Sequence, residues 1–339
     1  MAAFSNCVSW LQSASIPSRA SSRARLRISS AHHEWNHDVQ VLVAMDKGYF
    51  KEEELEDVEL IVFPGDEAAQ LEALANGFLD IAIDPLIHRV LAAQDQGADI
   101  YIVGPRRKMH SFVIFGQKWM KSIEDLRGRT LHVGNEGEVT QQLRRILILA
   151  GMEYGKDVKI ARRPNKNMHD LEGFRQSFIR EETLTVNVHP WETEEWSRKG
   201  YPVLADTTKL FAPRQDRVVG ATGSLVNGRP DTLKAFLKSY IKASRFIVNR
   251  ENSEEIKGIL ERAGFLTDEV DRRNFPKVME GQWHRLSPDG SFPLEGVEQV
   301  IKEQKEAGNI SAKVKLEKVV RLAPLYQAQK ELGIEPSQN

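Results

Sequence analysis

Residues 57–84, DVELIVFPGDEAAQLEALANGFLDIAID, predict a strand, a helix and a second strand in close succession. The apolar run at residues 58–63 ends at a Pro-Gly turn, and apolar residues then recur over residues 68–75 with the 3.6-residue period of a helix. Gly77 ends that helix before a short apolar strand at residues 81–83. This unit predicts a parallel sheet with a right-handed crossover, in which ligands bind beyond the carboxyl ends of the strands.

The composition excludes several classes of protein. The 339-residue chain has 41% hydrophobic and 28% charged residues, which is typical of a globular protein with two domains. A formal net charge of −1 gives no general attraction to nucleic acid, and no apolar run approaches the roughly 20 residues of a transmembrane helix. The single cysteine, Cys7, excludes an intrachain disulfide and a multi-cysteine metal site. We therefore expect no resident metal or cofactor.

Residues 1–24 differ in composition from the rest of the chain. They are rich in serine, contain Arg19 and Arg23, and no acidic residue precedes Glu34. They lack the continuous apolar stretch of a secretory signal, so their composition favours an organelle transit peptide or a disordered extension.

The remaining chain predicts an α/β fold with two lobes. Residues 25–117 and 216–335 are expected to form one discontinuous lobe, residues 118–215 the second, and residues 336–339 a tail. A strand, a glycine-bearing turn and a helix follow one another again at residues 130–150, as they do in the first lobe. Two crossings between the lobes suit a cleft that closes on a small molecule.

Several short motifs lie along this framework. The pattern A-x-x-x-G-x-F occupies residues 44–50, and A-L-x-x-G-x-x-D-I-A-I occupies residues 73–83. SIEDLRGRTLHVG follows at residues 122–134, and KVVRLAPLYQAQKELG at residues 318–333. Together they resemble the aliphatic-sulfonate, taurine and nitrate solute-binding proteins of ABC transporters, a superfamily that includes the thiamine-pyrimidine synthases. The resemblance covers about residues 25–335 and is specific for the fold rather than for the ligand.

The resemblance implies a type II periplasmic-binding-protein fold with a ligand between the lobes, an ABC transporter permease as partner, and a periplasmic or other extracytoplasmic location. We expect a monomer. Two features depart from the family pattern. No Sec signal or lipobox is evident, so a cytoplasmic or organellar location stays an alternative. The cysteine-rich, iron-linked motif of the thiamine-pyrimidine synthases has no counterpart, because Cys7 is the only cysteine.

Four of the candidate contacts lie in two segments at the ends of strands. The turn at residues 134–140 enters a helix, whose free N–H groups suit an anion or a polar head group, and the matching turn of the family lies at the cleft. Asn135 and Thr140 are therefore candidate contacts, although the segment also fits a plain strand-to-helix turn. Asp84 and Pro85 end the strand of the opening segment, where Asp84 alternatively caps the next helix.

Residues 32–37 form a polar segment after the first strand. Trp35 is suited to stack on a planar ligand, and His33 or His37 to hydrogen-bond it. The two histidines also have the four-residue spacing that holds a metal on a helix, but no third ligand is evident. A solvated loop is the remaining interpretation.

The other candidates lie nearer the predicted crossings and in the second lobe. His189, Trp191 and Glu192 follow a strand and open a helix, and Trp191 alternatively packs on Trp196. A cationic loop at residues 106–111 would attract a carboxylate or sulfonate, with His110 and Ser111 as its candidate contacts. Its Arg107 and Lys108 are expected to be solvated. Arg214, Asp216 and Arg217 are expected to form hinge or surface pairs.

The sequence favours binding over catalysis, because it has no nucleophile elbow, P-loop, zinc-protease motif or dinucleotide fingerprint. The leading hypothesis is a protein that captures an aromatic or polar carboxylate- or sulfonate-like molecule by hinge closure, for ABC-type uptake. The alternative is an enzyme on the same scaffold, a decarboxylase or a pyrimidine-synthase-like protein, that uses the cleft histidines.

Overall fold

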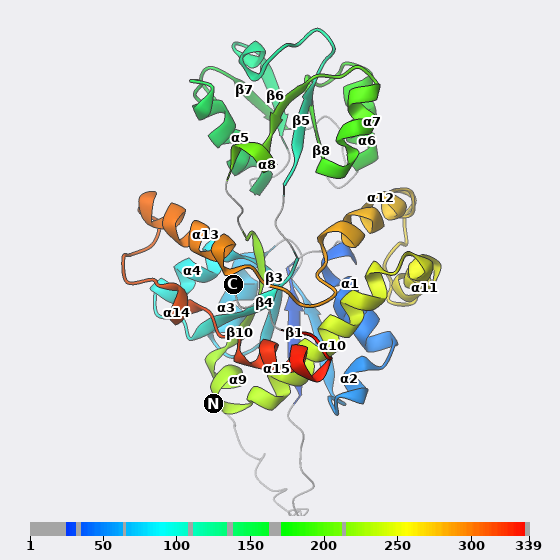
Figure 1. Cartoon of the computed structure of the whole chain (residues 1–339), viewed down its shortest axis with the longest axis vertical. Helices are drawn as coiled ribbons and strands as arrows, with labels where there is room; N and C mark the ends of the chain where they lie inside the picture. Colours follow the sequence, from blue (N-terminus) through cyan, green and yellow to red (C-terminus); the bar gives the residue numbers. More distant parts are fainter. Residues whose placement is uncertain are drawn as a thin grey trace, which may run out of the picture.

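The computed structural model describes residues 25–31, 35–63, 66–107, 111–133, 138–162, 171–211 and 215–335. They form a larger lobe and a smaller lobe (Figure 1). The chain leaves the larger lobe after β4 (Ile100–Pro105) and returns at β10 (Arg217–Thr222), so two crossings join the lobes. The predicted two-lobed α/β fold is confirmed.

The larger lobe is built on a five-stranded sheet. Its spatial order is β2 (Val58–Val62), β1 (Leu26–Ser30), β3 (Ile81–Leu86), β10 and β4. β1 is parallel to β2 and β3, whereas β10 is antiparallel to β3 and β4. Residues 57–84 form β2, α3 (Glu67–Ala75) and β3 as predicted, and Gly77, with a φ of 73°, follows the helix in the left-handed conformation. The carboxyl ends of β1, β3 and β4 and the start of β10 therefore share one edge.

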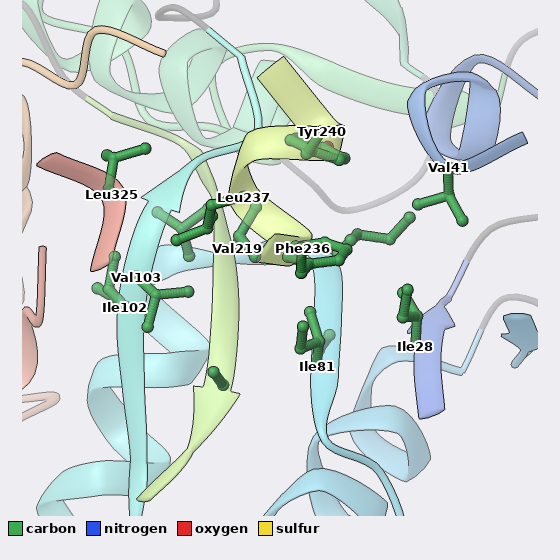
Figure 2. Packing of buried hydrophobic residues seen from close by; sticks show 14 of the residues in the cluster. Ile28, Val41, Ile81, Ile102, Val103, Val219, Phe236, Leu237, Tyr240 and Leu325 are labelled. Carbon is green, nitrogen blue, oxygen red and sulfur yellow. The ribbon is translucent and has the colours of Figure 1, made fainter. Parts of the chain in front are cut away.

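Helices flank this sheet and bury its apolar side chains. α1 (Trp35–Asp46) packs against α10 (Pro230–Val248), which also contacts α15 (Ala323–Glu331). Figure 2 shows Phe236 and Leu237 of α10 among the side chains of the sheet. Full burial of such side chains contributes roughly 1.5–3 kcal/mol each. The lobe also contains α2 (Tyr49–Glu52), α4 (Ile87–Asp95), α9 (Gly223–Gly228), the 3-10 turn η3 (Arg250–Asn252), α11 (Ser253–Arg262), α12 (Glu269–Arg285), α13 (Leu294–Glu306) and α14 (Leu316–Val319).

The smaller lobe contains two sheets. β5 (Val113–Gly116) pairs antiparallel with β8 (Thr185–Val188) and β9 (Val203–Asp206), and β6 (Thr130–Val133) pairs parallel with β7 (Lys159–Arg162). The expected boundary at residue 117 assigned β5 to the first lobe, but its pairing places it in the second. The remaining elements are η1 (Ile123–Leu126), α5 (Glu138–Leu149), α6 (Leu171–Ile179), η2 (Pro190–Glu192), α7 (Thr193–Arg198) and α8 (Thr207–Leu210).

The start of α1 differs from the sequence-based expectation. In the sequence, the polar segment at residues 32–37 precedes Asp38, a residue type that is favoured as a helix N-cap. In the structure, α1 begins at Trp35 and Asp38 is fully buried in its first turn. Trp35 packs on Phe275 of α12, with 5.4 Å between the ring centroids. Trp35 is buried against α12, which is distant in the sequence, and this contact extends α1 by a turn at its start. Local capping rules therefore could not locate the first residue of α1.

Candidate functional site

A cavity of about 230 Å³ lies between the lobes, at the edge where the strands of the larger lobe end. The larger lobe contributes side chains from α1, from the end of β4, from the start of β10 and from α12. The smaller lobe contributes side chains from α5, α6 and β8. The lining residues are Asn36, His37, Arg107, Phe112, Val139, Phe174, Arg175, Asn187, Val188, His189, Arg217, Lys277, Val278 and Arg285.

The lining combines positive charge with apolar surface. Its cationic side chains are Arg107, Arg175, Arg217, Lys277 and Arg285. Among the residues that the structure describes, no Asp or Glu side chain lines the cavity. The phenylalanine and valine side chains supply an apolar surface against which the body of an organic molecule can pack. The cavity therefore suits a small organic anion.

Two arginines of the larger lobe reach the cavity from neighbouring strands. Arg107 follows β4 and Arg217 begins β10, and β10 is inserted between β3 and β4. Arg107 Nη2 lies 3.1 Å from Oδ2 of the buried Asp216. Gln215 Nε2 donates to the carbonyls of Arg107 and Arg217, at 2.7 and 2.6 Å, and holds the two segments together. Arg107 is thus paired and preorganised rather than solvated, which corrects our expectation. Asp216 and Arg217 form ion pairs next to the second crossing, in agreement with the expected hinge pairs.

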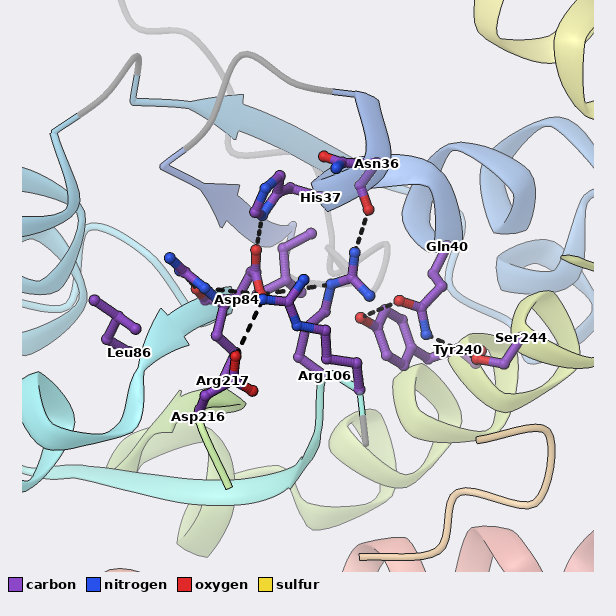
Figure 3. A network of polar contacts seen from close by, with 12 residues as sticks. Asn36, His37, Gln40, Asp84, Leu86, Arg106, Asp216, Arg217, Tyr240 and Ser244 are labelled. Carbon is purple, nitrogen blue, oxygen red and sulfur yellow. Dashed lines mark hydrogen bonds and ion pairs between the residues drawn. The ribbon is translucent and has the colours of Figure 1, made fainter. Parts of the chain in front are cut away.

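Asp84 is the centre of a buried polar network (Figure 3). Its Oδ2 contacts Nδ1 of His37, and its Oδ1 lies 3.7 Å from Arg106 Nε and 3.8 Å from Arg217 Nε. Arg217 also donates to the Asp84 carbonyl. Asp84 has a φ of 67°, a left-handed conformation that Asp tolerates better than most residues. The network fixes the ring of His37, which lines the cavity, and does not expose the carboxylate to a ligand.

A second buried layer supports the network. Arg106 is 2% exposed and donates to the Asn36 carbonyl. Burial raises the pKa of Asp38 to about 7, opposed by a hydrogen bond with Ser30 and by the charge of Arg106. Burial also raises the pKa of Tyr240 to about 12, and its hydroxyl donates to Gln40 Oε1 at 2.8 Å.

On the side of the smaller lobe, Glu192 orients the cationic wall. It is 4% exposed, and its Oε2 accepts from Arg175 Nη2 at 2.7 Å and from the His189 backbone N–H at 3.0 Å. Its Oε1 lies 3.4 Å from Nζ of Lys277, which belongs to α12 of the larger lobe. Glu192, predicted as a ligand contact, therefore lies behind the cavity surface and positions cations of both lobes.

Trp191 lies between two histidine rings. Its ring stacks on His189 with 4.4 Å between centroids and on His284 of α12 with 4.3 Å. The sequence left open packing against Trp196, but Trp196 instead packs among Phe115, Phe178 and Tyr201. The stack joins the two lobes beside the cavity.

The structure places the predicted contacts in three groups. His37 and His189 line the cavity. Ser111, Asp84, Pro85, Thr140, Trp35, Trp191 and Glu192 are described but do not line it. His33, His110 and Asn135 lie outside the described residues.

Sequence reasoning missed most of the cations. Arg107 and Arg217 stand at strand ends, a signal that could have identified them, whereas Arg175, Lys277 and Arg285 lie on helices without a motif. Within the described part of the chain, no cluster of three His, Cys, Asp or Glu side chains could hold a metal ion. No helix in that part is long and apolar enough to cross a membrane.

Comparison with known proteins places the fold. The periplasmic aliphatic sulphonate binding protein SsuA from Escherichia coli is 18% identical, with a TM-score of 0.60 over 88% of this chain and 92% of that one. The periplasmic nitrate-binding protein NrtA from Synechocystis PCC 6803 is 16% identical, with a TM-score of 0.63 over 91% and 89%. The alkanesulfonate-binding protein SsuA from Xanthomonas axonopodis pv. citri, bound to MOPS, is 16% identical, with a TM-score of 0.57 over 88% and 99%.

These similarities establish the periplasmic-binding-protein fold that the sequence motifs predicted. No curated protein matches the sequence. The family model described as NMT1/THI5 like matches residues 35–253, which is more than half of the chain. The protein therefore belongs to the NMT1/THI5-like family.

Proposed function

We propose that the protein is a solute-binding protein that captures a small organic anion in the interlobe cavity. The observation that carries this proposal is the cavity itself, which has five cationic side chains, apolar walls and no carboxylate among its described lining residues. Buried cations that are already positioned lose little conformational freedom when an anion arrives. The structural neighbours that bind aliphatic sulphonates and nitrate support an anionic ligand.

Closure of the lobes is the second part of the proposal. Arg145 of α5 lies 3.0 Å from Glu303 of α13, and Lys277 of α12 lies 3.4 Å from Glu192 in the smaller lobe. Contacts that exist only when the lobes approach favour the closed state, and a ligand that touches both lobes adds to that preference. Small-angle scattering should show a smaller radius of gyration when ligand is added.

Calorimetric titration with benzoate, benzenesulfonate and alkanesulfonates tests the binding. Benzamide serves as the uncharged control. We expect the anions to bind, and Lys277→Gln to weaken them several-fold because it removes a partly exposed cation of the lining. Arg198→Gln, an exposed arginine of α7, is the matched control and should bind as the wild type does. Binding of benzamide as tightly as benzoate would show that charge does not select the ligand.

Delivery to an ABC transporter permease is the proposed role, with the protein acting as a monomer. Uptake of labelled ligand by cells with and without the gene tests it, since unchanged uptake would argue against transport and leave binding intact. Light scattering on the purified protein tests the monomer.

Proton-transfer catalysis is a second candidate, favoured by the contact between His37 and Asp84. A carboxylate on Nδ1 leaves Nε2 of the ring as the nitrogen available to a ligand, as in catalytic histidine–aspartate pairs. In a decarboxylation, the bond to the carboxylate breaks, its electron pair remains on carbon, and protonated Nε2 supplies the proton. Loss of carbon dioxide from aromatic carboxylates, abolished by His37→Gln but not by Lys277→Gln, would support an enzyme. Absence of turnover would argue against it.

A further inference from the structure

Arg285 differs from the other cations of the cavity in its surroundings. It is the last residue of α12, it is partly buried, and its Nε donates to the Gly281 carbonyl at 3.1 Å. Among the described residues no carboxylate lies within ion-pair distance of its guanidinium. Burial, which is the largest cause, and the charge of Arg107 lower the pKa of Arg285 to about 9, although the charge of Asp216 opposes them. An anion between Arg285 and Arg107 would relieve this repulsion.

The deep wall of the larger lobe therefore has a positive excess. Arg107 pairs with Asp216, while Arg217 and the buried Arg106 share Asp84. Asp38 offsets Arg106 only in part, because burial raises its pKa to about 7. Arg285 adds a full charge that none of these carboxylates pairs with at short distance. One anionic group is needed at this end of the cavity.

A second cationic centre lies at the other end of the same helix segment. Lys277 and Arg285 are eight residues apart on α12, or about 12 Å along a helix that rises about 1.5 Å per residue. Lys277 and Arg175 share the buried Glu192. The other carboxylates near Lys277, Glu195 and Glu280, lie 3.9 and 3.8 Å away and are partly exposed to solvent, which screens them.

Apolar side chains line the same cavity as the two centres. Val278 of α12 lines the cavity, together with Phe112 and Phe174 of the smaller lobe. The cavity volume of about 230 Å³ lies below the usual range for ligand pockets of roughly 300–1,000 Å³, which suits a single ring with substituents rather than a nucleotide.

We propose that the preferred ligand is an organic dianion with a compact apolar body, such as a benzene ring carrying two carboxylates or a carboxylate and a sulfonate. One anionic group binds near Arg285 and Arg107, and the other near Arg175 and Lys277. The ring occupies the apolar section between them. This inference rests on the proposed anion binding and specifies the charge of the ligand.

Matched titrations test the charge preference. Benzoate carries one charge, and the three benzenedicarboxylates add a second at different spacings on the same ring. At low salt we expect at least one dicarboxylate to bind more than tenfold more tightly than benzoate, which corresponds to about 1.4 kcal/mol. The ratio of the dicarboxylate affinity to the benzoate affinity should fall as the salt concentration rises, because screening weakens the attraction of the second charge more than it weakens the contacts of the ring.

Two variants locate the effect. Arg285→Gln should reduce the preference for the dianion to near unity, whereas Arg285→Lys should retain most of it. Arg198→Gln is the control, and circular dichroism checks that each variant is folded. If Arg285→Gln does not fold, Lys277→Gln tests the other end in the same way. Equal affinities for benzoate and all dicarboxylates would overturn the dianion inference while leaving anion binding intact. If neither benzoate nor any dicarboxylate binds, both the dianion inference and the proposed anion binding are wrong.

Discussion

Glu192 offers a direct test of how the cationic wall is held together. Its carboxylate is 4% exposed and contacts Arg175 at 2.7 Å, Lys277 at 3.4 Å and the backbone N–H of His189 at 3.0 Å. Arg175 is itself 8% exposed. Replacing Glu192 with alanine leaves this arginine without its carboxylate partner.

The expected loss of stability can be worked from these contacts. Removing one partner of a buried ion pair costs about 3–5 kcal/mol, because the remaining charge is desolvated without compensation. Loss of the hydrogen bond to the His189 N–H at the start of η2 adds about 1 kcal/mol. Arg175 lines the cavity, where water can solvate its guanidinium, and this lowers the total. We expect Glu192→Ala to lower the free energy of unfolding by about 3 kcal/mol.

Urea unfolding followed by circular dichroism measures this loss. Glu192→Gln keeps an acceptor for the His189 N–H and isolates the contribution of the charge. Glu194→Ala is the matched control, since Glu194 is exposed and its ion pair contributes less than about 1 kcal/mol. A loss below about 1 kcal/mol for Glu192→Ala would refute the reasoning.

Three further predictions concern other parts of the structure. Burial raises the pKa of Asp38 from 3.8 to about 7, so the folded state retains a proton that the unfolded state releases. This stabilisation is complete below pH 4 and is lost as pH rises through 7. Between pH 5 and pH 8 the free energy of unfolding of the wild type should fall by about 2–3 kcal/mol, whereas that of Asp38→Asn should not show this fall. Urea unfolding at both pH values measures the difference. Gly223→Ala should destabilise by about 1–3 kcal/mol, because a Cβ there would lie 2.0 Å from the side chain of Asp99. Gly228→Ala, in the same short helix with open space around it, should be nearly neutral, and equal melting temperatures for the two variants would contradict the packing argument. Arg145→Gln removes a contact across the cleft and should increase the radius of gyration without ligand, and an unchanged scattering curve would show that this contact does not hold the lobes together.

Much of the framework could be predicted from sequence periodicity. Residues 57–84 form the predicted strand, helix and strand because their apolar residues have the spacing that each element requires. The structure differs from the prediction where contacts between residues distant in sequence outweigh the local sequence pattern. Trp35 starts α1 earlier than capping rules indicate because it packs on Phe275, and β5 belongs to the second lobe because β8 and β9 are its partners.

The cavity was less predictable than the fold. His37 and His189 line it and stood in segments that follow strands, which is the signal that general rules for α/β sheets provide. Arg107 had the same signal but stood in a charged run, which usually means a solvated loop. Arg175 and Arg285 had no local signal, because their role depends on which side of a helix faces the other lobe.

The sequence by itself determined the two-lobed α/β fold and its family. The hydrophobic periodicity and the short motifs that indicate them are local patterns, which extend over only a few helical turns or strands. Only the tertiary structure decided the charge of the cleft. Insertion of β10 between β3 and β4 brings Arg217 beside Asp84, 133 residues away in the chain, and places Arg107 next to both. Whether such an arginine is solvated or preorganised depends on the carboxylates that folding buries beside it, and no local pattern encodes that arrangement.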